Sequence, residues 1–147
     1  MRAAIDAVRV AGTPDGPVPV VVLSVDGESD VLPIFVGVDE ARSIAHGIDA
    51  IDIGRPMTHD LTLDIVEELG GRIDRVVVSE LRDGTYIADL HLNTPREDVV
   101  VDARPSDSLA MAARTNVPVE VSAEVFEEGR EDPEEFAELR DIREVLG

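Results

Sequence analysis

The sequence lacks cysteine, tryptophan and lysine altogether. Without cysteine, neither a disulfide scaffold nor a thiolate zinc site is available. Its core must be built from Val, Ile, Leu and Ala, and 147 residues suit a single domain with a core of its own. Aromatic residues are scarce, which argues against the aromatic surfaces on which single-stranded nucleic acid stacks. The only four are Phe35, Tyr86, Phe126 and Phe136.

Long apolar runs are also missing. No stretch of 18 apolar residues occurs, and the first ten residues include Asp6 and lack the apolar run of a signal peptide. We therefore expect a soluble cytoplasmic protein that does not bind membranes.

The charge is strongly one-sided, with 32 acidic residues against 13 arginines and a formal net charge of -19. Non-specific affinity for nucleic acid comes from cations that displace counterions from phosphate, so passive electrostatic binding is disfavoured. An acidic sequence without lysine resembles the proteins of haloarchaea, which live with molar internal salt. At roughly 1 M salt the Debye length is about 3 Å, so repulsion between acids is screened. We expect a halophilic protein whose charge serves solubility.

The chain pattern predicts an α+β fold, a single domain in which helices pack on a mixed or largely antiparallel β-sheet. Helical spacing of apolar residues predicts a helix from Asp39, as N-cap, to about residue 48, and further helices over 58–69, 106–114 and 124–127. Apolar runs between turn-forming residues predict strands over 3–10, 18–25, 31–36, 73–81, 85–92, 99–103 and 119–121.

The chain is expected to divide into a domain over 1–128 and an extension over 129–147. The extension begins as an acidic linker and continues as an amphipathic helix, with Asp132 at the N-cap and Pro133 at the first position. This helix must dock its apolar stripe either on its own domain or on a partner subunit. The stripe consists of Phe136, Leu139, Ile142 and Leu146.

Two segments repeat an Arg-Pro step followed by a hydroxyl residue and an acid at a predicted helix start. In the first, Arg55 precedes Thr58, His59 and Asp60. Free N–H groups at a helix N-terminus favour anions, and histidine is the side chain most readily used as a proton carrier near neutral pH. Ordinary capping by Thr58, with Asp60 in the first turn, is the alternative, although capping does not require His59.

The second segment is denser, with Asp102, Arg104, Ser106 and Asp107 at one corner between a strand and a helix. Arginine offers a planar fork of donors that suits phosphate or carboxylate, and paired aspartates hold hard divalent cations through oxygen. The alternative is an ion pair that only fixes the turn. If the two segments converge, they suit phosphodiester hydrolysis, in which a metal lowers the pKa of bound water and neutralises charge on the phosphoryl oxygens.

Six short motifs follow one another along most of the chain. They are Leu-Pro-Ile-Phe-Val-Gly at 32–37, Glu-Ala at 40–41, Arg-Pro-Met-Thr-His-Asp at 55–60, Leu-Gly at 69–70, Asp-Gly-Thr-Tyr at 83–86 and Asp-Ala-Arg-Pro-Ser-Asp at 102–107. In this order they resemble the bifunctional nuclease family, over roughly residues 5–128. The resemblance implies an α+β fold, dimers, and nuclease activity on DNA and RNA as in plant members.

The resulting hypothesis is a homo-oligomeric nuclease of low sequence specificity that uses Mg²⁺ or Mn²⁺ and no organic cofactor. The candidate catalytic residues are His59, Asp60, Asp102 and Asp107. The residues expected to bind substrate are Arg55, Thr58, Arg104 and Ser106. The expected metal ligands are Asp60, Asp102 and Asp107, with Glu40 as a further candidate. The rival hypothesis is a non-catalytic homo-oligomeric binding or assembly module that recognises a small anionic ligand.

The halophilic interpretation predicts that salt controls stability. At low ionic strength, unscreened repulsion between acids should lower the free energy of unfolding, whereas molar KCl should restore it. Unfolding followed by circular dichroism across a KCl series measures this dependence. Cooperative unfolding with undiminished stability in dilute buffer would contradict the interpretation.

Overall fold

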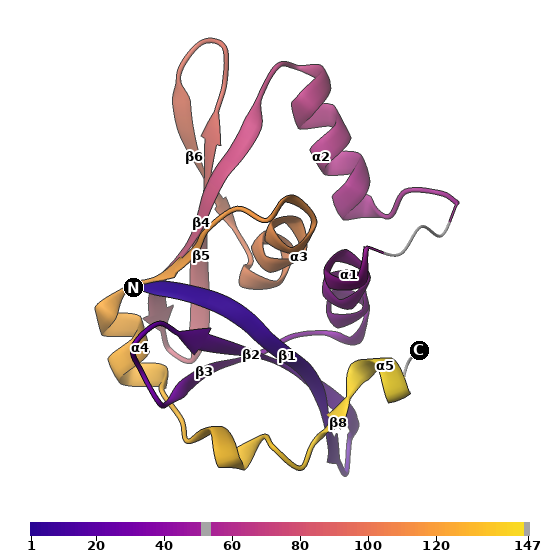
Figure 1. The fold of residues 1–147 in the computed structure, drawn as a ribbon, viewed down its shortest axis with the longest axis vertical. Coiled ribbons are helices and arrows are strands. Elements are labelled where there is room, and N and C mark those ends of the chain that lie inside the picture. The colour runs from indigo at the N-terminus through magenta and orange to yellow at the C-terminus, as the bar shows by residue number, and fades with distance from the viewer. Residues whose placement is uncertain (51–53, 146–147) are drawn as a thin grey trace.

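The computed structural model describes residues 1–50 and 54–145, which form an eight-stranded sheet with helices packed on it (Figure 1). The predicted α+β class is confirmed. The strands are β1 (Arg2–Thr13), β2 (Gly16–Val25), β3 (Val31–Phe35), β4 (Arg72–Arg82), β5 (Thr85–Asn93), β6 (Asp98–Ala103), β7 (Val119–Val121) and β8 (Arg140–Asp141). The helices are α1 (Val38–Asp49), α2 (Thr58–Glu68), α3 (Pro105–Thr115), α4 (Ala123–Gly129) and α5 (Ile142–Val145), with a 3-10 turn at Pro133–Glu135.

Two antiparallel hairpins, joined through the short strand β7, make up most of the sheet. Its order is β3-β2-β1-β7-β4-β5-β6, and β8 pairs with β1 beside this path. β4 and β7 run parallel, because the chain between them crosses over through β5, β6 and α3. The predicted turn between β4 and β5 is confirmed: Asp83 and Gly84 have φ values of 51° and 80°, as a type I′ hairpin turn requires.

α1 and α3 pack against each other and fill one layer of the core (Figure 1). Ile44 of α1 and Leu109 of α3 are fully buried in one cluster with Val76 and Val78 of β4. Removing such aliphatic side chains from water contributes roughly 25 cal/mol per Å² of apolar surface. Because both helices are anchored along their length, their first turns keep fixed positions relative to each other.

The start of α1 differs from the expectation. Gly37, with extended backbone (φ −74°, ψ 164°), is the N-cap residue, and its carbonyl accepts a hydrogen bond from the Ala41 N–H at 2.9 Å. Asp39 therefore lies within the first turn, where its charge still complements the helix dipole. The prediction that Asp39 caps this helix is wrong, because the chain turns into the helix directly from β3.

The expected C-terminal helix does not form as one continuous element in the described residues. The Asp132 carboxylate accepts a hydrogen bond from the Glu134 N–H at 2.9 Å, as the predicted cap should, but only a 3-10 turn follows. The chain then extends, and Arg140 and Asp141 pair with β1 before α5 begins. Pairing with a distant strand uses the backbone groups that a continuous helix would need.

The apolar residues of this segment dock on the chain's own sheet. Phe136 is 8% exposed and packs with Val20 and Val22, whose alternate neighbours on β2 face the core beneath α1 and α3. Ile142 enters that main core, and Leu146 lies outside the described residues. β2 is therefore covered on both faces, one of them by the C-terminal segment.

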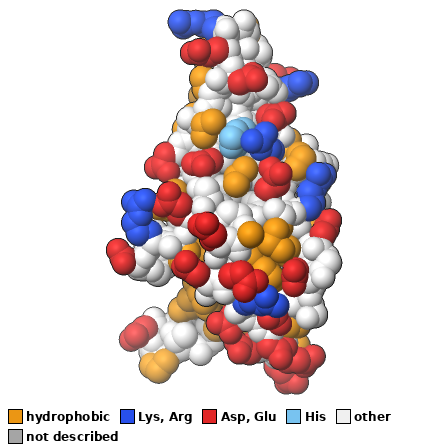
Figure 2. All heavy atoms as spheres, turned by 90° about the vertical axis from the view of Figure 1, so that its left-hand side faces the viewer, with side chains coloured by type: hydrophobic (Ala, Val, Ile, Leu, Met, Phe, Trp, Pro, Cys, Tyr) orange, Lys and Arg blue, Asp and Glu red, His pale blue; other side chains and the backbone are white. Residues whose placement is uncertain are grey.

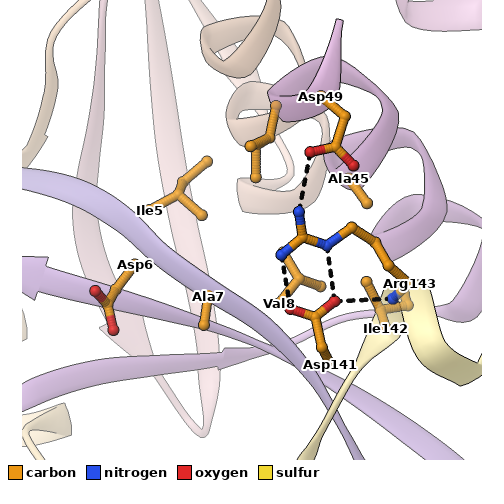
Figure 3. A pocket seen from close by; sticks show the side chains of 10 residues that line it. Ile5, Asp6, Ala7, Val8, Ala45, Asp49, Asp141, Ile142 and Arg143 are labelled. Atoms are coloured by element: carbon orange, nitrogen blue, oxygen red, sulfur yellow. Dashed lines mark hydrogen bonds and ion pairs between the residues drawn. The ribbon is translucent and has the colours of Figure 1, made fainter. Parts of the chain in front are cut away.

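Ion pairs fasten the C-terminal segment to α1 (Figure 3). Arg143 Nη1 lies 3.1 Å from Asp49 Oδ1, and Arg143 Nε and Nη2 donate to the two oxygens of Asp141 at 2.9 Å each. The hydrogen bonds from Arg143 lower the pKa of Asp141 to about 2 against the opposing effect of burial. The Asp141 carboxylate therefore stays charged, and its own pair with Arg143 stays formed, at all but strongly acidic pH.

Acidic side chains are spread over the face seen in Figure 2, with arginines and small hydrophobic patches between them. Within the described residues, no helix combines the length and the apolar composition that a membrane crossing requires.

Candidate active site

The two Arg-Pro segments meet in space. Met57 and Arg104 both have extended backbone, so α2 and α3 each begin immediately after a sharp turn; at Arg104 the following Pro105 disfavours helical geometry. His59 in the first turn of α2 and Asp107 in the first turn of α3 face each other, with Nε2 2.9 Å from Oδ1. The convergence that the sequence left as an assumption is thus present in the fold.

A chain of hydrogen bonds runs through His59 and joins α1, α2 and α3. Its Nδ1 lies 2.7 Å from the hydroxyl oxygen of Ser43 on α1. Arg114 of α3 donates to the same oxygen from Nη2 at 3.1 Å. Ser43 is 2% exposed and the Arg114 side chain 9%, so this end of the chain is shielded from water.

These partners determine which nitrogen of neutral His59 carries the proton. A carboxylate can only accept, so in neutral His59 the contact with Asp107 places the proton on Nε2. Nδ1 is then the acceptor of the Ser43 hydroxyl proton, and the Ser43 oxygen accepts from Arg114. The imidazole therefore has a fixed orientation and tautomer, and its proton points at Asp107.

Arg104 holds Asp107 from the other side. Its Nε and Nη2 donate to the two carboxylate oxygens at 2.8 and 3.0 Å, and its Nη1 lies 3.4 Å from Glu40 Oε1 on α1. The hydrogen bond from Arg104, helped by that from His59, keeps the pKa of Asp107 below its usual value although burial acts in the opposite direction. Asp107 is therefore a carboxylate at neutral pH, placed between an imidazole and a guanidinium.

The Asp60 side chain stabilises the start of α2 and forms no hydrogen bond with the side chains of the His59–Asp107 pair. Its Oδ1 accepts from Arg114 Nε at 2.6 Å, and its Oδ2 accepts from the Met57 backbone N–H at 2.9 Å. Burial alone would raise its pKa, but these two hydrogen bonds outweigh burial and the pKa is lowered. Met57 is the N-cap residue, so the alternative interpretation in which Thr58 caps this helix is wrong, and Asp60 supplies the polar contact at this helix end.

In residues 1–50 and 54–145, four of the predicted site residues lie outside this hydrogen-bonded network: Arg55, Thr58, Asp102 and Ser106. Asp102 is exposed on β6, opposite Asp89 of β5, and Arg55 is exposed in the segment before α2. Within the described part of the chain, neither makes a hydrogen bond or ion pair with the His59–Asp107 pair. Asp102 lies within β6, whereas Arg104 already belongs to the turn into α3, so nearness in sequence did not place the two side chains together.

A cavity of about 260 Å³ opens over the network. With roughly 30 Å³ per water, it has room for a phosphate group and several water molecules. Among the residues that the structure describes, no group of three or more histidine, aspartate or glutamate side chains is arranged to hold a metal ion. The polar side chains in its wall are those of Asp39, Glu40, Ser43, Thr58, His59, Arg104 and Asp107.

Sequence reasoning missed Ser43 and Arg114. Ser43 lies off the apolar stripe that predicts α1, and Arg114 occupies the last turn of α3, where a basic residue is unremarkable because it complements the helix dipole. Their importance arises only when three helices meet, so no local pattern could have identified them.

Comparison with known proteins places this fold and network in a family. A family model described as the bifunctional nuclease domain matches residues 21–134, which include every member of the hydrogen-bonded network. The chain belongs to the bifunctional nuclease domain family.

Several relatives share the domain within longer proteins. An uncharacterized protein of Mycobacterium tuberculosis is 38% identical over 108 residues, which are 74% of this chain and 64% of that protein. Bifunctional nuclease 1 of Arabidopsis thaliana is 30% identical over 110 residues, 72% of this chain and 34% of the plant protein. Bifunctional nuclease 2 of Oryza sativa subsp. japonica is 28% identical over 109 residues, 71% and 34% of the two chains. The matched region is thus 64% of the bacterial relative and about a third of each plant protein.

The lowered pKa of Asp107 predicts an acid-dependent contribution to stability. A carboxyl group whose folded pKa lies below its ordinary value of 3.8 stabilises the fold above that value and loses the contribution as pH falls through the folded pKa. We expect Asp107→Asn to lower the free energy of unfolding at pH 7, and the difference from wild type to shrink below about pH 4.

Urea unfolding at a series of pH values measures this difference. The matched control is Asp15→Asn, which removes the same charge from the exposed β1–β2 turn and should stay within about 0.5 kcal/mol of wild type. A difference for Asp107→Asn that does not change with pH would show that the Arg104 and His59 contacts do not stabilise its ionised form.

Proposed function

We propose that the protein is a cytoplasmic nuclease that hydrolyses phosphodiester bonds of DNA and RNA with low sequence specificity. Family membership and the names of the plant relatives support this class of reaction. The observation that carries the proposal is the 2.9 Å contact between His59 Nε2 and Asp107 Oδ1 at the wall of an open pocket, with Arg104 on the same carboxylate.

In the proposed reaction, a water oxygen forms a bond to phosphorus and one of the existing P–O bonds to the sugar breaks. The attacking water must lose a proton and the departing oxygen must gain one. We assign these transfers to the His59–Asp107 pair, because a histidine and a carboxylate in hydrogen-bond contact at a pocket wall are groups that commonly serve as general acid and base. Arg104 stabilises the negative charge that builds on the phosphoryl oxygens, since its guanidinium lies at the pocket wall.

We propose a divalent cation as a further participant, since Mg²⁺ is commonly bound by one or two carboxylates together with substrate phosphates. Glu40 and Asp107 are the carboxylates that flank Arg104 there. Mg²⁺ or Mn²⁺ held by them would supply charge neutralisation and a more acidic water. Neither Asp60 nor Asp102 lines the pocket, so of the predicted metal ligands the proposal keeps Glu40 and Asp107, whose oxygens also bind Arg104.

The proposal predicts that His59→Ala and Asp107→Ala each lower the rate of nucleic-acid cleavage by about 10²- to 10⁴-fold, the contribution of a positioned acid–base group. Cleavage of labelled single-stranded DNA and RNA in high KCl, with Mn²⁺, with Mg²⁺ and with a chelator, measures the loss.

Asp15→Asn serves as the control for purification and folding, because it lies in an exposed turn. If the wild-type protein cleaves no faster than Asp107→Ala, the proposed nuclease function is refuted. Retained binding of a small anion to that inactive wild-type protein would instead support a non-catalytic binding module.

We also propose that the chain forms homo-oligomers through α2. None of its residues is buried, and Leu61, Ile65 and Leu69 are 50%, 52% and 75% exposed. Residues four apart lie on one face of a helix, so these three form a single apolar stripe. An exposed apolar stripe on a highly acidic protein is typical of an interaction surface, and two copies related by a two-fold axis would cover each other's stripe.

We expect Ile65→Asp to convert the wild-type oligomer to monomer, because the charge would be buried without a partner in the interface. Light scattering coupled to gel filtration measures the mass. Ile48→Asp, at a 45% exposed position on α1, is the matched control and should leave the mass unchanged. A monomeric wild-type protein would contradict this proposal.

A further inference from the structure

Phe35 is an exposed aromatic residue in a chain that has few. It ends β3, whose four preceding residues are all buried, yet Phe35 is 58% exposed. The other aromatic residues are buried or half-buried, so Phe35 is the one that presents its ring to solvent. Exposing a large apolar ring has a cost in water, which is offset when the ring meets a ligand.

Phe35 lines a groove of about 530 Å³ that adjoins the candidate active site. Tyr86 of β5 lines the same groove, and Glu40 and Arg104 belong to both its wall and that of the 260 Å³ pocket. The two cavities are therefore neighbours on either side of the Arg104–Glu40 contact. A chain of nucleotides lying in the groove would continue directly into the pocket that holds His59.

The groove also has the features of an anion site. α3, of 11 residues, starts at its wall, and its N-cap residue Arg104 provides no side-chain hydrogen bond to this helix end. α1 also starts there, but the Glu40 carboxylate lies against its N-cap residue Gly37, so the anion site is at α3. Free N–H groups and the helix dipole favour negative charge there. The second, independent feature is Ser106, which lines the groove, is 7% exposed, and has no hydrogen-bond partner for its hydroxyl among the described residues.

We propose that this groove binds the nucleotide next to the scissile bond, with its base stacked on Phe35 and its phosphate at the start of α3, bonded to Ser106 and Arg104. The inference rests on the proposed nuclease function and names its substrate class: single-stranded DNA or RNA. Paired bases have both faces covered, so a duplex cannot stack on the ring. Every base has a π-face, so stacking gives affinity with little sequence preference.

The absence of tryptophan from the sequence allows a direct test. Phe35→Trp places a single tryptophan in the groove, and its fluorescence should be quenched when a base stacks on it. The measurement is made with Mg²⁺ in a Phe35→Trp/His59→Ala protein, which does not cleave, using short oligodeoxythymidine and oligoriboadenosine. Val100→Trp with His59→Ala is the matched control, because Val100 on β6 is 58% exposed, pairs with His91 and does not line the groove, so it should show no quenching.

Two further ligands separate the sources of the signal. An abasic oligomer of the same length should bind without quenching, and a mononucleotide should quench only at higher concentration, because it lacks the neighbouring phosphate contacts. Equal quenching by mononucleotide and oligomer would overturn the inference that the groove holds a segment of a strand.

Variants without the introduced tryptophan give a second readout, the binding affinity and the kinetics of cleavage. Phe35→Ala should weaken oligomer binding by about 5- to 150-fold and raise KM, with kcat little changed, whereas Phe35→Tyr should restore binding. Because Phe35 is exposed, none of these changes should disturb folding, which circular dichroism checks.

The outcomes distinguish this inference from the proposed function. If the wild-type protein cleaves nucleic acid, but Phe35→Trp/His59→Ala shows no quenching and Phe35→Ala no change in KM, the groove inference is overturned and the nuclease proposal stands. Quenching by oligomers without wild-type cleavage would leave a groove for single-stranded nucleic acid and refute hydrolysis.

Discussion

The arrangement of the candidate site depends on one buried cation, the guanidinium of Arg114. It donates to the Ser43 carbonyl and hydroxyl on α1, to the Ala110 carbonyl on its own helix, and to Asp60 on α2. α2 buries none of its residues, and Leu63 is its one residue that packs, half-buried, against the main core, so apolar packing contributes little to its position. Its position relies on the Asp60–Arg114 and His59–Asp107 contacts, and a buried charge that loses its partner is strongly destabilising. The positions of the side chains around His59 thus follow from the hydrogen bonds that the Arg114 guanidinium must make.

The sequence predicted the sheet well where local signals and tertiary structure agree. Alternating apolar residues and the Asp83-Gly84 turn determine the β4–β5 hairpin locally, and proline explains where α3 begins. In the C-terminal segment the local signal and the tertiary structure disagree, because helical spacing competes with pairing to the edge of β1. There, pairing at Arg140 and Asp141 and burial of Phe136 against β2 outweigh a few residues of helix propensity. Only the folded sheet offers those partners.

For the site, the sequence identified the helix starts but not the directions of the side chains. His59, Arg104 and Asp107 meet because two helices begin at the same corner of the fold. Asp102 is only two residues from Arg104, but it lies on β6 opposite Asp89 and does not reach the site. Ser43 contacts His59 from α1, although the two are more than a dozen residues apart in sequence. Sequence spacing can predict which residues lie near the same helix start, whereas the contacts between their side chains depend on tertiary packing.

The net charge of -19 constrains how such a protein could bind nucleic acid. Broad electrostatic attraction, which supplies most non-specific affinity in basic proteins, is not available to it. Binding must then come from short-range contacts: helix N-termini, the Arg104 guanidinium beside Glu40, and a ring such as Phe35. Stacking and hydrogen bonds of this kind weaken little at high salt, unlike exposed ion pairs. In that corner Arg104 lies between Glu40 and Asp107, so it offers directed donors without net positive charge. The proposed site therefore suits a flexible single strand better than a duplex, because only a flexible strand can bring a base and a phosphate into that corner together.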